Sequence, residues 1–431
     1  MVAHRQLQNP LAPQPETQAG TPHTARLGPK PYGLVDGSTV NTIRHRRVNS
    51  PRSISRVLDL STDMKKPTQQ TRVVRPWRSL LITACIATLS ASSAAERSPR
   101  YSVIPLGTPI NDFAESANFM QPWRINNKGD IVGLSTHGPF LYRRGAVHYL
   151  GSAGEGFEAR SLLAINDRGV IIGVAQDLSL EYPDNVTSFI LRDSGRDRDL
   201  NLALASLLPF PAFIAWDIND RGTIVGELGN FPNRAAAIYQ HGQLRQLPGL
   251  VPGGDNVAVG INKRGQIVGS AAVQAGSWHN RPIIWSEGRM ENLGILPGFF
   301  NADGTAINDL GHVVGFCNND DTWAGFIYRD GVMSQLPQPT GARLFLPTHI
   351  NNLGDVLIWF FSGQAGVYDS YWLYSNGAVH DLSPIVAEAS GWPIYNLSMR
   401  DMNDRGEIVG TAQYDDGHGG QLSQGILLVP R

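Results

Sequence analysis

One nine-residue motif recurs seven times between residues 125 and 410, and no other feature limits the fold of this chain as strongly. The motif is Ile-Asn-x-x-Gly-x-Ile/Val-Val/Ile-Gly, and its copies read INNKGDIVG, INDRGVIIG, INDRGTIVG, INKRGQIVG, INDLGHVVG, INNLGDVLI and MNDRGEIVG. Successive copies lie 40, 53, 43, 46, 43 and 52 residues apart. Periods of about this length indicate a repeat architecture, so the chain from the first copy to the last is expected to form one fold.

The motif has the composition of a tight β-hairpin turn. Asn in the first position can accept hydrogen bonds from its own backbone, and Gly adopts positive φ without the roughly 1–2 kcal/mol that a side chain would cost there. Ligand or metal binding by seven Asn/Asp turns is the alternative explanation. The predicted structural turn residues are Asn126, Gly129, Asn166, Gly169, Asn219, Gly222, Asn262, Gly265, Asn308, Gly311, Asn351, Gly354, Asn403 and Gly406.

Each unit contains four short apolar segments separated by turns. The first ends at Ile-Asn, the second is Gly-x-Ile-Val-Gly, the third is rich in aromatic residues (PFLYRRG, GFIYRDG), and the fourth runs to a Leu (AVHYLG, RMENLG). Four evenly spaced strands per unit of 40–50 residues are typical of a β-propeller blade. We therefore predict an all-β fold, a seven-bladed β-propeller of four-stranded blades.

The two ends of the repeat region predict how the ring closes. The seventh unit stops at Arg431 after its third strand, and YSVIPLG (101–107) is a strand of the fourth type with no unit before it. We expect this N-terminal strand of the mature chain to complete the last blade, which would leave no open sheet edge at the junction.

Charge divides the chain into two parts. Residues 1–95 carry a net charge of +9, whereas residues 96–431 carry 23 Lys and Arg against 33 Asp and Glu. An acidic repeat region makes nucleic acid an unfavourable partner. Cys317 is the only cysteine in residues 96–431, so no disulfide framework is expected there.

The N-terminal part reads as sequence that does not belong to the repeat fold. Residues 1–63 lack periodicity and are expected to be disordered or untranslated. From Met64 a basic segment, an apolar run near 80–89 and small residues up to Ala95 match a secretory signal peptide, so 64–95 is predicted to be a signal peptide and 96–431 the β-propeller repeat domain. Lipidation at Cys85 is the rival interpretation. A membrane span in the mature chain is not expected, because the apolar run is too short.

The segment from Trp285 to Phe316, WSEGRMENLGILPGFFNADGTAINDLGHVVGF, resembles the HAF repeat, a bacterial repeat family. The resemblance extends over all seven units. Of the tripeptide His-Ala-Phe that names the family, only Phe is kept, at Phe140, Phe189 and Phe326. The resemblance implies an extracellular repeat protein and implies no particular reaction.

Candidate binding residues lie in the connections of variable length, which a propeller gathers on the face opposite its tight turns. Loops held on a rigid scaffold commonly carry binding residues. Aromatic side chains there are candidates for stacking on a sugar ring or a partner. The paired acids Asp320-Asp321 and Asp415-Asp416 are candidates for Ca²⁺ as a cofactor. Packing against blade edges, for the aromatics, and solvation, for the acids, are the structural alternatives. The predicted ligand-binding residues are His137, Trp278, His279, Asp320, Asp321, Trp323 and Trp392.

No linear catalytic motif occurs: the chain has no GxSxG, HExxH, GxxxxGK[ST] or EF-hand loop, and we name no catalytic residue. We therefore predict an exported, extracellular or periplasmic binding module, expected to be monomeric, for an extracellular glycan or an envelope protein. Two alternatives stay open. One is an extracellular polysaccharide-acting hydrolase or lyase with its site on the variable loop face, and the other is a surface scaffold without a small-molecule ligand.

Overall fold

The computed structural model describes residues 98–111, 119–150, 157–177, 186–192, 213–229, 233–319, 321–363, 369–418 and 420–431. All of them belong to one unit of the chain, Thr88–Arg431. The predicted signal peptide, the N-terminal extension and Cys85 lie outside the described residues, as does the expected fourth strand of the second unit.

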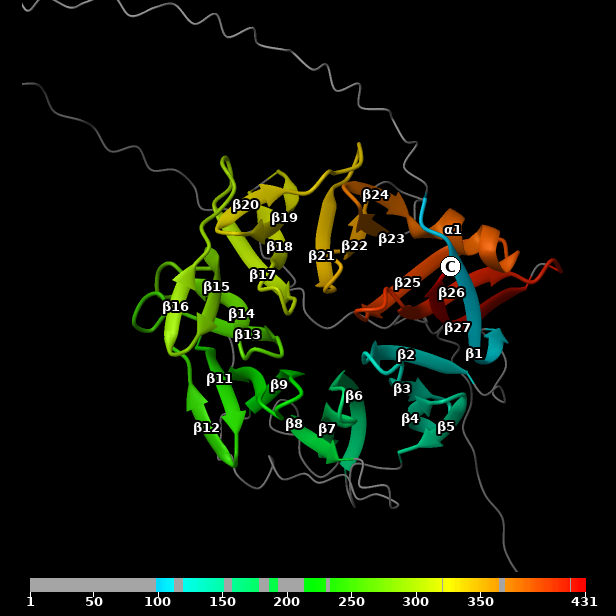
Figure 1. Cartoon of the computed structure of the whole chain (residues 1–431), viewed down its shortest axis with the longest axis horizontal. Coiled ribbons are helices and arrows are strands. Elements are labelled where there is room, and N and C mark those ends of the chain that lie inside the picture. The colour runs from blue at the N-terminus through cyan, green and yellow to red at the C-terminus, as the bar shows by residue number, and fades with distance from the viewer. Residues whose placement is uncertain are drawn as a thin grey trace, which may run out of the picture. The chain divides into compact units, whose positions relative to one another are not determined.

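Seven antiparallel sheets stand around a common axis, in chain order, so the predicted seven-bladed propeller is confirmed (Figure 1). The first strand of each unit is innermost. Blade 1 contains β2 (Met120–Ile125), β3 (Ile131–Ser135), β4 (Gly138–Arg143) and β5 (Ala146–Tyr149). Blade 2 contains β6 (Phe157–Ile165), β7 (Val170–Asp177) and β8 (Val186–Arg192). Blade 3 contains β9 (Phe213–Ile218), β10 (Ile224–Leu228), β11 (Ala235–Gln240) and β12 (Gln243–Gln246). Blade 4 contains β13 (Asn256–Ile261), β14 (Ile267–Ala272), β15 (Asn280–Ser286) and β16 (Arg289–Asn292).

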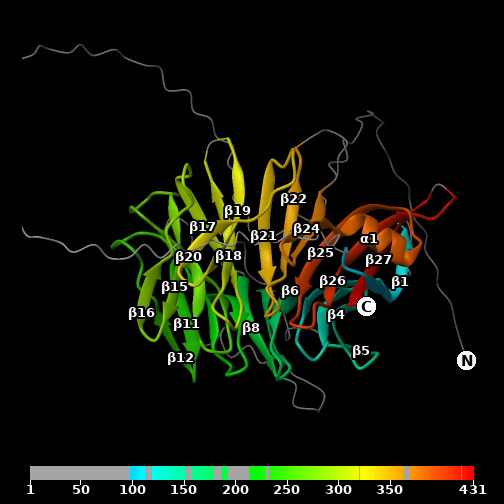
Figure 2. The same cartoon turned by 45° about the horizontal axis from the view of Figure 1, so that its top comes forward.

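The remaining three blades follow the same plan (Figures 1 and 2). Blade 5 contains β17 (Asn301–Ile307), β18 (Val313–Asn318), β19 (Trp323–Arg329) and β20 (Val332–Gln335). Blade 6 contains β21 (Leu344–Ile350), β22 (Val356–Phe361), β23 (Ser370–Ser375) and β24 (Ala378–Asp381). Blade 7 contains β25 (Ile394–Met402), β26 (Ile408–Asp415) and β27 (Gln421–Pro430), with β1 (Tyr101–Asn111) as its outermost strand.

Blade 7 is built from both ends of the repeat region, as predicted. Strand β1 pairs antiparallel with β27, with Tyr101 opposite Pro430 and Leu106 opposite Gly425. The two strands lie side by side in Figure 1, cyan beside red. This pairing removes the open edge that β27 would otherwise present.

The core consists of separate apolar layers between neighbouring sheets. One layer packs Val225 and Ala236 of blade 3 against Ile267 and Ile283 of blade 4, and all four side chains are almost completely buried. Comparable layers of buried side chains lie at the other blade junctions. Each blade is therefore stabilised by burial of apolar surface against both of its neighbours.

Both tight turns of the blades have the predicted backbone. In every Asn-x-x-Gly turn the Gly has φ between 73° and 88° and donates its N–H to the carbonyl oxygen of the motif Asn at 3.0–3.1 Å. In five blades the turn between the third and fourth strands has positive φ at both central residues, for example 50° at Glu287 and 77° at Gly288. Such primed turns suit the right-handed twist of the strands that they join.

The last Gly of the motif leaves room for a β-bulge in the neighbouring innermost strand, a feature that the sequence did not predict. Every innermost strand has a β-bulge three residues before its motif Asn, such as Trp216 in β9 and Val259 in β13. A Cβ on Gly226 or Gly269 would overlap the carbonyl oxygen of Ile214 or Val257 on the bulged strand. Blade 6 is the exception, with Ile358 at this position. The bulges turn the next side chains towards the axis.

The insertion before the seventh motif copy folds into a helix rather than a loop. Helix α1 (Leu382–Ser390) begins after Asp381, whose side chain accepts a hydrogen bond from the Ser383 N–H, and ends at Gly391 in the left-handed region. Leu382 and Val386 are fully buried in the blade 7 core. No helix among the described residues has the length and apolarity needed to cross a membrane.

Candidate functional site in the axial channel

The seven motif asparagines, called the anchor asparagines below, form a closed ring of hydrogen bonds around the axis. Each Nδ2 donates to the main-chain carbonyl oxygen of the anchor asparagine in the next blade. All seven side chains are buried, with 2–5% of their surface exposed. In blade order from Asn126 the distances are 3.0, 2.9, 3.2, 2.9, 2.9, 3.4 and 3.0 Å, the last from Asn403 back to Asn126.

The same side chain also holds its own turn. In blade 4 the Oδ1 of Asn262 accepts the N–H groups of Arg264 and Gln266 at 3.1 and 2.9 Å. The Oδ1 atom therefore holds the turn, and the Nδ2 atom adds a link between blades. Only Asn offers both functions at this length, because Asp lacks the donor and Ser lacks the second polar atom.

The residue after each anchor asparagine, called the first tip residue, forms a second ring. The seven first tip residues are Asn127, Asp167, Asp220, Lys263, Asp309, Asn352 and Asp404. In six of the seven junctions the backbone N–H of one residue donates to the side-chain Oδ1 of the next, at 2.8–2.9 Å. The exception is the junction from Asp220 to Lys263, where Lys offers no acceptor.

Lys263 is the cation of this second ring. Its Nζ lies 3.3 Å from Asp167, 4.0 Å from Asp220, 3.7 Å from Asp309 and 3.9 Å from Asp404. Burial lowers the pKa of Lys263, but the surrounding carboxylates outweigh it and the net pKa is raised. One ammonium group thus neutralises part of a ring with four carboxylates.

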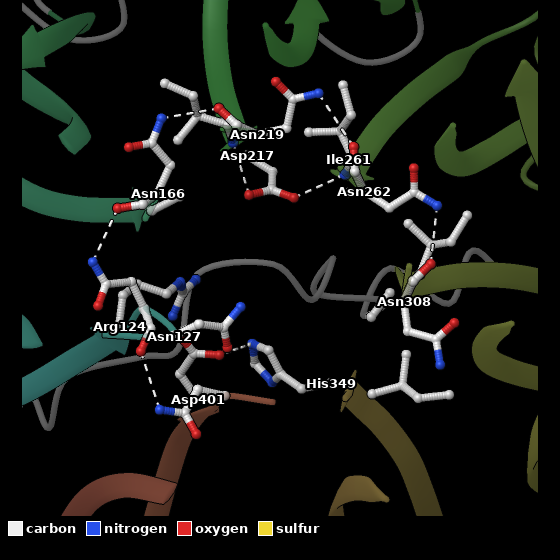
Figure 3. Close-up of a pocket in the computed structure, with 18 of the residues that line it drawn as sticks. Arg124, Asn127, Asn166, Asp217, Asn219, Ile261, Asn262, Asn308, His349 and Asp401 are labelled. Carbon is white, nitrogen blue, oxygen red and sulfur yellow. Dashed lines mark hydrogen bonds and ion pairs between the residues drawn. The ribbon is translucent and has the colours of Figure 1, made fainter. Parts of the chain in front are cut away.

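Inside these rings the channel contains a pocket of about 370 Å³. Its walls come from the residues two positions before the anchor asparagines, which the bulges place at one level. They are Arg124, Ala164, Asp217, Gly260, Ala306, His349 and Asp401, and they are called the axial residues below. Figure 3 shows Asp217, His349 and Asp401 pointing towards the axis from three different blades. The volume of the pocket lies within the range of about 300–1,000 Å³ that is common for small-molecule sites.

Asp217 bridges two blades and has a strongly perturbed pKa. Its carboxylate accepts the N–H groups of Ile218 at 2.7 Å and, from the next blade, of Ile261 at 2.8 Å. Burial raises the pKa of Asp217 to about 7, although these two hydrogen bonds and the Arg124 charge oppose the change. At neutral pH this group can therefore accept or release a proton.

His349 and Asp401 contact each other across the junction of blades 6 and 7. The Nε2 of His349 lies 3.3 Å from Oδ1 of Asp401, and its Nδ1 lies 3.1 Å from Oγ1 of Thr348. Asp401 also accepts the N–H of Ile125 in blade 1 at 2.9 Å. Burial lowers the pKa of His349, with the Asp401 carboxylate opposing, so the ring is mostly neutral at pH 7. A neutral imidazole next to a carboxylate is suited to proton exchange with a ligand.

Arg124 supplies a positive charge to the pocket wall. Its Nε donates to the carbonyl oxygen of Leu163 in blade 2 at 2.6 Å, and one terminal nitrogen donates to that of Trp123 at 2.9 Å. These bonds fix the guanidinium in the same channel as the Asp217 and Asp401 carboxylates (Figure 3). Backbone groups of neighbouring residues or blades thus hold Arg124, Asp217 and Asp401, whereas the side chains of Asp401 and Thr348 hold His349.

The described residues among those predicted from the sequence lie outside this pocket. They are in the connections between second and third strands, at the start of the third strand β19 (Trp323), or ahead of a first strand (Trp392). Exposed Trp278 contacts His279 at 4.3 Å and Phe300 at 5.6 Å between ring centroids. Trp323 contacts Phe316 at 5.1 Å, and Trp392 stacks on Tyr414 at 4.6 Å. Exposed His137 contacts Tyr149 at 5.4 Å. The structure thus brings together Trp278 and His279, has Asp321 and Trp323 together where β18 leads into β19, and leaves His137 and Trp392 in two other connections.

The predicted acidic loops form turns in the described structure. Asp320 lies outside the described residues, and the backbone of exposed Asp321 donates to Oδ1 of Asn319 at 3.0 Å. The Oδ1 of Asp416 accepts the N–H groups of His418 and Gly420, both at 2.8 Å. Among the described residues no three His, Cys, Asp or Glu side chains are grouped to bind one metal ion. Ca²⁺ binding stays a prediction.

The axial residues were missed because their chemistry is not local in sequence. Arg124, Asp217, His349 and Asp401 lie up to 277 residues apart and share only their position relative to the anchor asparagine. Alignment of the seven copies reads Arg, Ala, Asp, Gly, Ala, His and Asp at that position. A position that varies in polarity within an otherwise apolar strand is the signal that identifies them.

No model of a known protein family matches the sequence, and no curated protein matches it. Solved propeller structures are similar to this chain at low identity. The β-propeller domain of the Trilobed protease from Pyrococcus furiosus has 13% identity and a TM-score of 0.44, over 66% of this chain and 96% of that one. YCF48 from Cyanidioschyzon merolae has 11% identity and a TM-score of 0.42, over 77% and 98%. TolB from Acinetobacter baumannii has 11% identity and a TM-score of 0.37, over 57% of this chain and only 60% of TolB. These likenesses concern the fold alone.

Proposed function

We propose that this β-propeller is an exported binding module that holds a small ligand rich in hydrogen-bond donors, such as a neutral or amino sugar, in its axial pocket. The observation that supports this most directly is the convergence of Asp217, His349 and Asp401 on one pocket of about 370 Å³. Titratable groups with perturbed pKa values in a concave site are typical of functional sites.

The charges around the pocket favour this ligand class. Among the residues that the structure describes, six carboxylates line it, from Asp167, Asp217, Asp220, Asp309, Asp401 and Asp404. The cations that line it are Arg124 and Lys263. An anionic ligand would be repelled, whereas hydroxyl or ammonium donors can bond to the free lone pairs of the carboxylates. Apolar neighbours such as Ile218 and Ile261 supply surface for the carbon skeleton.

Export is supported by the signal-peptide pattern of residues 64–95 and by the resemblance to the HAF repeat, and not by the described residues. N-terminal sequencing of the secreted protein tests it, with cleavage expected after Ala95. Trp278 and His279 stay our prediction for a second contact with an extended glycan, because Trp278 is 53% exposed and the two rings touch.

A ligand screen on two variants tests the axial site. Thermal unfolding is measured with glucose, glucosamine and N-acetylglucosamine in turn, since a ligand that binds only the folded state raises its stability by about 2.7 kcal/mol at 100 times Kd. Ala306→Phe places a large side chain at an axial position without removing a hydrogen bond, and Ser334→Phe on the exposed strand β20 is the matched control. We expect a sugar to stabilise the wild type and the Ser334 variant but not the Ala306 variant. Equal stabilisation of all three would contradict axial binding.

The contact between His349 and Asp401 favours a second candidate function, an acid–base reaction on a polysaccharide. An imidazole held by a carboxylate can act as general base or acid, with Asp217 as its partner of opposite role. The test is release of reducing ends from soluble polysaccharides by the wild type and by His349→Asn. Activity that the His349 variant loses while it still binds sugar would assign catalysis. Binding without turnover in the wild type would leave the binding function alone.

A further inference from the structure

The second tip residues of the Asn-x-x-Gly turns form an exposed ring of their own. They are Lys128, Arg168, Arg221, Arg264, Leu310, Leu353 and Arg405, one from each blade in order. All seven are exposed, Leu310 at 57% and Leu353 at 70%. The cations and the leucines are segregated, because blades 1–4 and 7 carry the five cations and the adjacent blades 5 and 6 carry the two leucines.

The second tip cations of blades 1–4 are available for binding, because they take part in no ion pair among the described residues. Lys128, Arg168, Arg221 and Arg264 form no ion pair with any residue that the structure describes. Arg405 differs, since it contacts Glu407 and donates to the carbonyl oxygen of Asn127. The nearby carboxylates of the first tip residues point inward, where Lys263 and backbone N–H groups bind them. The face of the propeller that carries the Asn-x-x-Gly turns is called the turn face below. On this face the acidic first tip residues point towards the axis, and the cationic second tip residues of blades 1–4 point towards solvent.

From this arrangement we infer that the turn face is a docking surface for an acidic protein segment that carries an apolar side chain. Cations on four consecutive blades, with no ion-pair partner in the described part of the chain, attract carboxylates and speed encounter. A single exposed Leu is ordinary, but Leu310 and Leu353 occupy neighbouring positions where every other blade has a cation, and a buried apolar anchor is the usual centre of an interface. The net charge of the repeat region is negative, so the composition alone does not reveal this local group of cations.

This surface and the axial pocket differ in polarity, so the two sites favour different ligands. The pocket lies inside a ring of carboxylates and favours donor groups, whereas the docking surface favours carboxylates. The side chains of the second tip residues also take no part in the anchor ring, because only their backbone N–H groups donate to the anchor asparagines. Substitutions there should leave folding and axial binding unchanged.

The experiment uses labelled peptides with repeating Glu-Glu-Leu, Gln-Gln-Leu and Glu-Glu-Ser sequences, and fluorescence anisotropy at low and moderate salt. We expect saturable binding of the Glu-Glu-Leu peptide only. The variant Arg168→Gln/Arg221→Gln/Arg264→Gln should weaken it about tenfold or more at low salt, since each exposed ion pair contributes up to about fivefold. Leu310→Ser/Leu353→Ser should weaken it by a similar factor, with little dependence on salt.

Matched controls come from exposed positions on the outer strands. They are Arg245→Gln/Arg289→Gln, on β12 and β16, and Val332→Ser, on β20, and they should bind the peptide like the wild type. The inference is overturned by no saturable binding, or by equal losses in the control variants. It is also overturned if phosphatidylglycerol vesicles bind in place of the peptide, or if light scattering shows that the surface joins two copies of this chain.

Discussion

The Nδ2 of Asn403 donates to the carbonyl oxygen of Asn126 at 3.0 Å, a hydrogen bond between residues 277 positions apart in sequence. It closes the anchor ring at the junction where strand β1 closes the last sheet. The propeller is thus joined twice at this junction, at the axis by a side chain and at the periphery by a strand. Because every anchor asparagine makes the same bond, the seven junctions are nearly equivalent.

Asn262→Asp is expected to separate the two functions of an anchor asparagine. The carboxylate can still accept from Arg264 and Gln266, but it cannot donate to Asn308 and places its charge against a carbonyl oxygen. Loss of a buried donor of this kind costs about 2–3 kcal/mol in the free energy of unfolding, measured by chemical denaturation. Asn292→Asp is the matched control, because Asn292 is exposed and, among the described residues, its side chain bonds only within its own turn. Equal effects of the two substitutions would show that the link between blades adds no stability.

The ring could be predicted from the sequence because each pattern that indicates it is local in the chain. The period of the Asn motif, the positive φ of the glycines and the missing fourth strand at Arg431 all predicted features that the structure confirms. The helix after Asp381 was not predicted, since its nine residues lie in an insertion without a repeat. The axial site was not predicted either, because closure of the ring, rather than any local pattern, brings His349 to Asp401.

The two glycines of one motif copy are expected to differ in their tolerance of Ala. At Gly265 an added Cβ meets open space, so Gly265→Ala should cost only the roughly 1–2 kcal/mol of a left-handed backbone. At Gly269 the Cβ would overlap the carbonyl oxygen of Val257, and relief requires movement of the bulged strand. We therefore expect Gly269→Ala to cost more than about 3 kcal/mol. The midpoints of denaturant unfolding measure both, and a larger effect at Gly265 would refute the close-approach explanation of the second Gly.

Lys263→Met should destabilise the protein at neutral pH in a manner that depends on salt. Without the ammonium group, the four carboxylates of Asp167, Asp220, Asp309 and Asp404 face one another across the axis. Since Lys263 is 44% exposed, we discount the effect to about 1 kcal/mol at low ionic strength, and it should shrink in 1 M salt. The raised pKa of Lys263 means that its contribution is complete at neutral pH and is lost only as the pH rises through that value.

The control for Lys263 is an exposed lysine in the same kind of turn on another blade. Lys128→Met removes an exposed second tip cation that forms no ion pair with the described residues, so thermal unfolding of this variant should match the wild type. If the two variants were equally stable at low salt, the ion pairs of Lys263 would carry no net stabilisation. A difference between them that persists undiminished in 1 M salt would point to lost packing instead.

Asp217 makes the stability of the propeller depend on pH in an unusual direction. Its pKa is raised from 3.8 to about 7 in the folded state, so between these values the folded chain binds more protons than the unfolded chain. The contribution of Asp217 to the free energy of unfolding is therefore fully present at acidic pH, and it is lost as the pH rises through about 7. The difference between the two pKa values corresponds to at most about 4 kcal/mol, and to less where the channel lets water reach the carboxylate. Comparison of wild type with Asp217→Asn, which cannot ionise, isolates the effect. We expect the stability of the wild type relative to this variant to fall between pH 4.5 and pH 8, and a difference that stays constant or increases over this range would show that Asp217 ionises at its ordinary pKa.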